Sequence, residues 1–252
     1  MRFLTWAWDY EVASGGCVAL HRLAHNLAAL GHDSILTCDR TAPGWLGRTG
    51  GCRASAGVIA IYPEIVDGNP LGAQRVVRWL LNTPGFFGVG SQEYGGNDLV
   101  MLWQWKYGAA LDPKYAYGGL LTAYRDLSHF RDRPDIRQRE FGNTKRWSHS
   151  YIVRKADRMP GAITDGHHEA DAIPLDGYGT DERLIEVLNL SQRFTCYDPN
   201  TMISTLANLC SVPEIVLPNG GDVLSREQVV ARQELSVQQT QEFAETCERH
   251  WK

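Results

Sequence analysis

The sequence predicts an α/β protein that consists of two doubly wound halves and a C-terminal helix. Three observations support this prediction. Short apolar runs alternate with amphipathic helical stripes, as in parallel sheets with crossover helices. Gly31 follows the first stripe, where a helix C-cap belongs. A charged stretch poor in aliphatic residues separates two such series. We expect the halves at 1–125 and 150–224, a linker at 126–149 and the helix at 225–252.

The first half begins with a β–α–β pattern. Residues 2–8 predict a buried strand, and apolar residues at positions 18, 20, 23, 27 and 30 form the stripe of a helix. Residues 34–38 predict the second strand. Further along, we expect a helix over AQRVVRWLLN, residues 73–82, and strands at 57–62, 98–105 and 119–124.

The second half repeats the alternation of strands and helices. TDERLIEVLNLSQ predicts an amphipathic helix with Thr180 or Asp181 as its N-cap, and TMISTLANLC, residues 201–210, predicts another. Ser225 and Gln228 have the spacing of a capping box, so a long polar helix should follow them to the end of the sequence. The strands of this half are expected at 150–155, 170–175, 193–197 and 214–218.

The composition argues against two classes of function. The formal net charge is -4 and the isoelectric point is near 6.1, so a large basic footprint for nucleic acid is not evident. No apolar run approaches about 18 residues and the N-terminus lacks a signal pattern, so we expect no membrane span. Six cysteines form no CxxC pair and no Cys/His cluster. We therefore expect reduced structural thiols, no bound metal and a cytoplasmic location.

The loop DYEVASGG, residues 9–16, joins the first predicted strand to the first helix. Ligands of open α/β sheets bind at the carboxyl ends of the strands, which is where this loop lies. Gly15 and Gly16 allow a ligand to approach the backbone closely, and Asp9 lies where a general base is useful. A tight turn into the helix explains the glycines equally well, because the GxGxxG pattern is absent.

The loop YPEIVDGNPL, residues 62–71, follows the third predicted strand and opens at the same edge of the sheet. Its prolines and Gly68 should hold Glu64, Asp67 and Asn69 in a fixed arrangement. Glu64 is a second candidate for the general base. The alternative interpretation is a rigid loop in which Asp67 or Asn69 caps a helix.

Two features of the second half favour phosphate binding. Arg154 and Lys155 end an apolar strand, where they offer a bidentate fork and a mobile point charge to phosphate oxygens. The free N–H groups at the start of the helix over 201–210 suit a diphosphate. Polar residues surround that start: Asp198, Asn200, Thr201 and Ser204. The alternative is that Asn200 is a simple N-cap, which is worth about 1 kcal/mol.

These pieces together resemble a GT-B-type glycosyltransferase, a family built from two Rossmann-like halves. The first half is similar in WDYEVASGGCVALHRLAHNLAALGHDSILT and the second in YDPNTMISTLANLCSVPEIVLPNG. YPEIVDGNPL, RWLLNTPG, YIVRKAD and YDPNT resemble pieces of bacterial cell-surface polysaccharide glycosyltransferases. The resemblance covers both halves but not residues 86–147.

The resemblance implies a metal-independent transfer of a sugar from a nucleotide-diphosphate donor to an acceptor hydroxyl. It implies that Arg154, Lys155 and the helix start at Thr201 hold the donor diphosphate. The acceptor, a carbohydrate or a modified DNA base, should lie against the first half near Gly15 and Gly16. No cofactor is expected beyond the nucleotide sugar, which is a co-substrate.

Two departures from the family pattern keep alternatives open. Many retaining members carry two glutamates with seven residues between them, and the corresponding positions here hold Asp198 and Leu206, so the stereochemistry stays open. The chain is also short for this architecture, which favours a non-catalytic nucleotide-sugar-binding or scaffold protein. A phage enzyme that glycosylates hydroxymethylated DNA bases is another alternative, because the stretch 125–147 is rich in cations: Arg125, Arg131, Arg133, Arg137, Arg139, Lys145 and Arg146.

Overall fold

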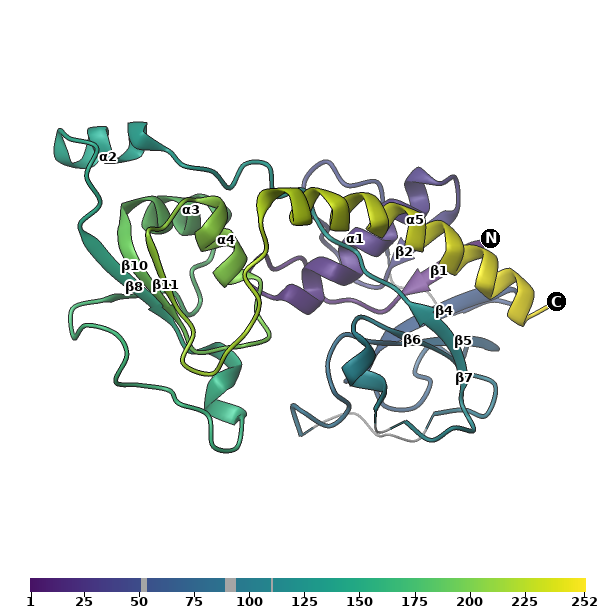
Figure 1. Ribbon diagram of the computed structural model, residues 1–252. Coiled ribbons are helices and arrows are strands. Elements are labelled where there is room, and N and C mark those ends of the chain that lie inside the picture. The colour runs from purple at the N-terminus through teal and green to yellow at the C-terminus, as the bar shows by residue number, and fades with distance from the viewer. Residues whose placement is uncertain (51–53, 89–93, 110) are drawn as a thin grey trace. The chain divides into compact units, whose positions relative to one another are not determined.

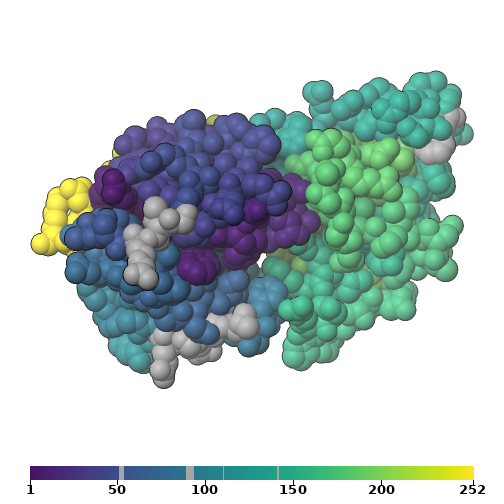
Figure 2. All heavy atoms as spheres, turned by 180° about the vertical axis from the view of Figure 1, so that it is seen from behind, coloured from purple at the N-terminus to yellow at the C-terminus, as the bar shows by residue number. Residues whose placement is uncertain are grey.

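The chain divides into two compact units. The computed structural model describes residues 1–50, 54–88, 94–109 and 111–252. Unit 1 contains Met1–Arg125 and Arg232–Lys252, and unit 2 contains Asp126–Ala231. The colours of Figure 2 separate the atoms of unit 1, mostly purple and blue, from those of unit 2, mostly teal and green.

Unit 1 is built on a parallel seven-stranded sheet with the order β3-β2-β1-β4-β5-β6-β7 (Figure 1). All six strand pairs are parallel. The central strands consist of apolar residues that are buried on both faces, as is typical of parallel sheets. The strands are β1 (Arg2–Thr5), β2 (Asp33–Leu36), β3 (Arg48–Thr49), β4 (Val58–Pro63), β5 (Arg75–Leu80), β6 (Leu99–Leu102) and β7 (Ala116–Leu120).

Helices α1 (Gly15–Ala29) and α5 (Arg226–His250) cover one face of this sheet. The stripe predicted for the first helix is confirmed, since Leu20, Leu23 and Leu27 are completely buried against strand residues. Gly31 has a φ of 82°, the left-handed conformation expected just beyond a helix end. The opposite face packs against loops and the short 3₁₀ helix η1 (Trp105–Gly108).

The helix predicted over residues 73–82 is wrong, because strand β5 occupies this segment. Val77 and Trp79 face the α1 side of the sheet, whereas Val76 and Leu80 pack on the opposite side. A strand buried on both faces gives a continuous apolar run, which cannot be told from a buried helix by periodicity alone. The loop predicted after β4 therefore leads into a neighbouring strand and not into a helix.

Unit 2 contains a second parallel sheet with the order β11-β10-β8-β9. Its strands are β8 (Ser148–Ile152), β9 (Ile173–Pro174), β10 (Ser191–Cys196) and β11 (Glu214–Val216). Helices α3 (Asp181–Leu190) and α4 (Ile203–Leu209) pack on one face through a core that includes Leu184, Val187 and Leu206. Thr180 caps α3 as predicted, because its side chain accepts the N–H of Arg183 at 3.2 Å.

Residues 126–149, for which we expected a linker, are grouped with unit 2. They include helix α2 (Pro134–Phe141), which begins with proline in its first turn and ends at Gly142 with a φ of 65°. Two arginines of this segment, Arg137 and Arg146, are anchored to unit 2 through buried hydrogen bonds that are described below.

The capping box predicted for the last helix is confirmed. The Ser225 N–H donates to Gln228 Oε1 at 2.8 Å, and the Gln228 N–H donates to Ser225 Oγ at 3.3 Å. Helix α5 therefore begins in unit 2, and its later residues complete unit 1, where Phe243 and Cys247 join the main core.

Two predictions, that no segment spans a membrane and that the cysteines are reduced, can be compared with the described residues. Among these residues no helix has both the length and the hydrophobicity that crossing a membrane requires. Five cysteines are buried as free thiols, and Cys52 lies outside the described residues: Cys17, Cys38, Cys196, Cys210 and Cys247 are the five.

Candidate functional site

The sheet of unit 1 reverses its strand order beside β1. The chain builds outward from β1 to β2 and β3, and then starts again on the other side of β1 with β4. This is the Rossmann-like order, and ligands of such sheets bind outside the carboxyl ends of the strands at the reversal. The loops that follow β1 and β4 open at this edge, so residues 9–16 and 64–69 lie where the sequence predicted.

The start of α1 lies in the first of these loops. Ser14 is the N-cap, and its hydroxyl accepts the N–H of Cys17 at 3.3 Å. A Cβ atom added to Gly15 would meet no atom within 4 Å, whereas one on Gly16 would lie 3.7 Å from the Leu81 side chain. The first turn carries no acidic residue. Packing therefore does not require a glycine at position 15, and its backbone is open to approach.

Asp9 organises the loop after β2. Its Oδ1 accepts the N–H groups of Asp39 and Arg40 at 3.0 and 2.9 Å, and its Oδ2 pairs with Arg40 Nε at 2.8 Å. Hydrogen bonds from Arg40 hold the pKa of Asp9 below its ordinary value. A carboxylate with a lowered pKa is a weaker proton acceptor, so these contacts favour a role for Asp9 in shaping the loop.

Glu64 is the first residue after β4 and is only 4% exposed. Its carboxylate accepts the N–H of Leu81, the first residue after β5, at 2.9 Å. Leu81 in turn lies next to Gly16. The structure therefore links the ends of two neighbouring strands and the start of α1 through Leu81. The sequence marked the start of α1 and the loop after β4, but not the end of β5.

The rest of the loop after β4 is held rigidly. Asn69 Oδ1 accepts the Tyr62 hydroxyl at 2.8 Å and the Ala73 N–H at 3.0 Å. Arg78, which is buried and paired with Asp98 at 2.8 Å, donates to the carbonyls at positions 66 and 68. Asn69 thus has a structural role, and Asp67 is exposed in the same loop.

Arg154 and Lys155 lie in the 3₁₀ helix η2 (Arg154–Arg158), directly after β8. The N–H groups of Val153 and Arg154 donate to the two carboxylate oxygens of Asp176 at 3.0 and 2.7 Å. Arg154 has a φ of 46°, a left-handed conformation that residues other than glycine rarely adopt. Asp176 therefore holds the chain in a sharp turn, and both cationic side chains are half-buried there.

Polar side chains of the predicted phosphate socket before α4 make hydrogen bonds within unit 2. Asp198 Oδ1 accepts the Asn200 N–H at 2.9 Å, and the Thr201 hydroxyl accepts the Ile203 N–H at 3.4 Å. The Ser204 hydroxyl donates to the carbonyl of Asp222 at 2.9 Å. The N-cap of this seven-residue helix is Met202, so the expectation that Asn200 caps it is wrong.

Charges gather at the end of β10 in unit 2. The pKa of Cys196 is raised to about 12, mainly by burial, and nearby charges also act on it: Asp198 and Asp176 raise this pKa and Arg154 lowers it. Asp198 is almost fully buried, and in the part of the chain that the structure describes its Oδ2 has no hydrogen-bond partner. A buried carboxylate repels phosphate oxygens, so Asp198 is poorly suited to the diphosphate role that the sequence suggested.

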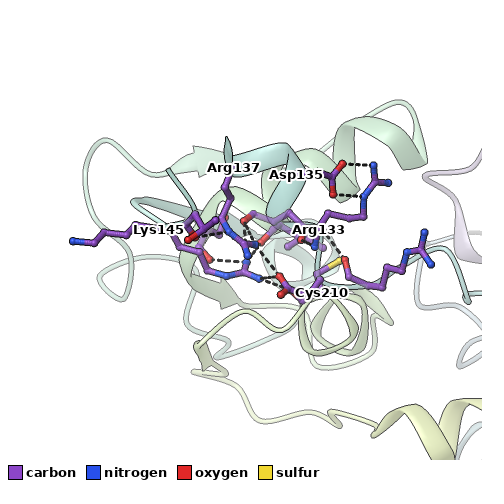
Figure 3. Close-up of polar contacts among 12 residues, drawn as sticks. Arg133, Asp135, Arg137, Lys145 and Cys210 are labelled. Atoms are coloured by element: carbon purple, nitrogen blue, oxygen red, sulfur yellow. Dashed lines mark hydrogen bonds and ion pairs between the residues drawn. The ribbon is translucent and has the colours of Figure 1, made fainter. Parts of the chain in front are cut away.

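Sequence reasoning missed an arginine hub in unit 2 (Figure 3), which consists of Asp132, Arg137, Arg146 and Asn189. Both arginines donate to Asp132 Oδ1, at 2.8 and 2.7 Å. Arg146 also donates to the carbonyls of residues 188, 189, 191 and 210, which end α3 and α4. Lys145 extends away from this hub. The sequence offered one signal for this hub, the alternating charges along 131–146. That pattern does not identify which arginines are buried.

The chain was also compared with known proteins. It matches no protein-family model and none of the curated proteins. Among the described residues, no group of three or more His, Cys, Asp or Glu side chains is arranged to hold a metal ion.

Proposed function

We propose that the protein is a glycosyltransferase of the GT-B type that moves a sugar from a nucleotide-diphosphate donor to an acceptor hydroxyl. The observation that carries the proposal is the reversal point of the unit 1 sheet, where Leu81 connects a buried carboxylate, Glu64, to the glycine-containing start of α1. Two separate parallel-sheet units are in keeping with two Rossmann-like halves. The buried free thiols agree with a cytoplasmic location.

The proposed roles follow from the contacts of each residue. Glu64 is the general base in an inverting transfer. The acceptor oxygen forms the bond to the anomeric carbon, the bond to the diphosphate breaks with its electron pair on the leaving oxygen, and the acceptor proton moves to Glu64. In unit 2, Arg154 and Lys155 are the proposed contacts of the donor diphosphate, whose negative charge they offset. Asp198, Asn200, Thr201 and Ser204 shape the loop between β10 and α4.

Thermal unfolding with a panel of nucleoside diphosphates and their sugars tests this proposal. A ligand at 100 times its dissociation constant adds about 2.7 kcal/mol of stability, which is a visible shift. We expect one nucleotide class to raise the melting temperature and the Arg154→Ala/Lys155→Ala double variant to lose that shift while remaining folded. If no nucleotide shifts the melting temperature, or if the folded double variant binds like the wild type, the proposal is wrong.

A DNA acceptor is the weaker form of the proposal. Of the seven cations between 125 and 147, Arg137 and Arg146 are buried in the hub, and Arg133 and Arg139 are paired with neighbouring carboxylates. Few cations remain for a phosphate backbone. Binding of a nucleotide sugar without hydrolysis or transfer would support the non-catalytic alternative instead.

A further inference from the structure

One corner of unit 1 contains buried polar atoms without hydrogen-bond partners. This β4–β5 corner consists of Glu64, Asn82 and Tyr94, which are 4%, 4% and 9% exposed. In the part of the chain that the structure describes, the side-chain nitrogen of Asn82 and the hydroxyl of Tyr94 are closed to solvent and make no hydrogen bond. Such atoms are rare in folded proteins, and each requires an explanation.

The contacts of Glu64 link it to both of these residues. Its carboxylate accepts the N–H of Leu81, the residue directly before Asn82. Its charge also acts on Tyr94. Burial is the main reason that the pKa of Tyr94 rises to about 12, and the negative charges of Glu64 and Asp67 add to this rise. Asn82 is thus the next residue after the one that bonds to Glu64, and the Tyr94 hydroxyl is within reach of the Glu64 charge.

Loose packing does not explain the unpaired atoms, because the polar groups around them are well paired. Arg78 lies over the Tyr94 ring at 5.2 Å and donates to Asp98 at 2.8 Å. The Tyr94 N–H donates to the Tyr115 hydroxyl at 2.9 Å, and Asn82 Oδ1 accepts the Thr83 N–H at 2.8 Å. The fold thus satisfies the side-chain oxygen of Asn82 and the N–H of Tyr94, while the side-chain donors of both residues stay unused among the described residues.

We propose that the β4–β5 corner binds a hydroxyl group of a carbohydrate acceptor, with Tyr94 and Asn82 donating to its oxygen and Glu64 accepting its hydrogen. A hydroxyl matches this set because it donates and accepts at once. A phosphate would be repelled by Glu64, and an ammonium would meet two donors. Because both donor atoms are closed to solvent, binding requires neighbouring side chains to shift. This inference rests on the proposed function. Tyr94 and Asn82 would hold the acceptor hydroxyl beside the base, Glu64.

The Tyr94→Phe variant tests the inference, because it removes one unpaired hydroxyl and keeps the ring. We expect its urea midpoint without ligand to equal or exceed that of the wild type, since a buried unsatisfied group is lost. Its affinity for a panel of methyl glucosides, galactosides and mannosides, measured by NMR titration without donor, should fall about tenfold, the effect of one hydrogen bond. Asn82→Asp, which replaces the donor by an acceptor of the same shape, should weaken glycoside binding similarly.

Tyr115→Phe is the matched control. It removes a hydroxyl that is paired with the Tyr94 N–H, so it should lower the urea midpoint and leave glycoside affinity within about twofold. The inference is overturned if the wild type binds no glycoside of the panel, or if Tyr94→Phe binds them as the wild type does. The glycoside titration contains no donor, so its result does not depend on nucleotide-sugar binding. The proposed function is instead wrong when no nucleotide sugar binds or reacts.

Discussion

The carboxyl edges of the two sheets treat their polar side chains in opposite ways. At the edge of unit 2, Ser204, Thr201 and Asp176 bond to the backbone of the unit itself, and an acceptor, Asp198 Oδ2, has no partner among the described residues. In unit 1, Glu64 makes a backbone bond, but Asn82 and Tyr94 keep donors that no residue among those described satisfies. Polar residues at a strand end are therefore not equivalent evidence for a site. Those that the fold already uses stabilise loops, and an unused atom needs an explanation that also fits its charge and its neighbours.

The largest effect is expected when the Glu64 carboxylate of unit 1 is removed. We expect Glu64→Gln to reduce the turnover of the transfer reaction by about 10²- to 10⁴-fold, the contribution of a positioned base. The amide oxygen can still accept the Leu81 N–H, so stability and donor binding should change little. Steady-state kinetics and the donor-induced thermal shift check this. Wild-type turnover in the variant would remove Glu64 from the mechanism.

The next effect concerns the arginine hub of unit 2. Arg146→Ala removes one donor from each of the carbonyls that end α3 and α4, and it leaves Asp132 with one arginine fewer. We expect a loss of about 3 kcal/mol in the free energy of unfolding. Lys145→Ala, which changes the neighbouring side chain that extends away from the hub, should stay within about 0.5 kcal/mol. Equal urea midpoints for the two variants would mean that the hub is not structural.

A smaller effect is expected at the start of α5. Ser225→Ala removes one half of the capping box and should cost about 1 kcal/mol. Ser225→Asp keeps an acceptor for the Gln228 N–H and places negative charge at a helix start, so it should restore most of that loss. Chemical denaturation of the three proteins measures the difference. A fully stable alanine variant would show that the box does not contribute to stability.

The smallest effect is a pH dependence in unit 2. Hydrogen bonds from arginines lower the pKa values of Asp132 and Asp135, the latter to about 2. Because these folded-state pKa values lie below the unfolded value of about 3.9, the stabilisation is present above pH 4 and is lost as the pH falls further. Melting temperatures between pH 5 and pH 2.5 should fall less steeply in Asp135→Asn. The difference is small because the Arg133–Asp135 pair is exposed.

Local patterns were sufficient for much of the fold. The leucine stripe of α1, the Thr180 cap and the Ser225–Gln228 box are short-range features, and the structure confirms each of them. Strand β5 was missed because its residues are buried on both sides, which removes the alternation that marks a strand. The position of Glu64 at an edge was predictable. Its neighbours Asn82 and Tyr94 were not, because strand order brings them close from distant parts of the sequence.

Helix α5 has a consequence for the order in which the protein folds during synthesis. The ring centroids of Phe3, in the first strand, and Phe243, near the end of the last helix, lie 5.7 Å apart in one core. The ribosome must release residue 243 before these rings can meet. All residues of unit 2, 126–231, are synthesised before residues 232–252 of unit 1. Translation therefore favours a nascent chain in which the middle folds while the N-terminal unit waits for its final helix.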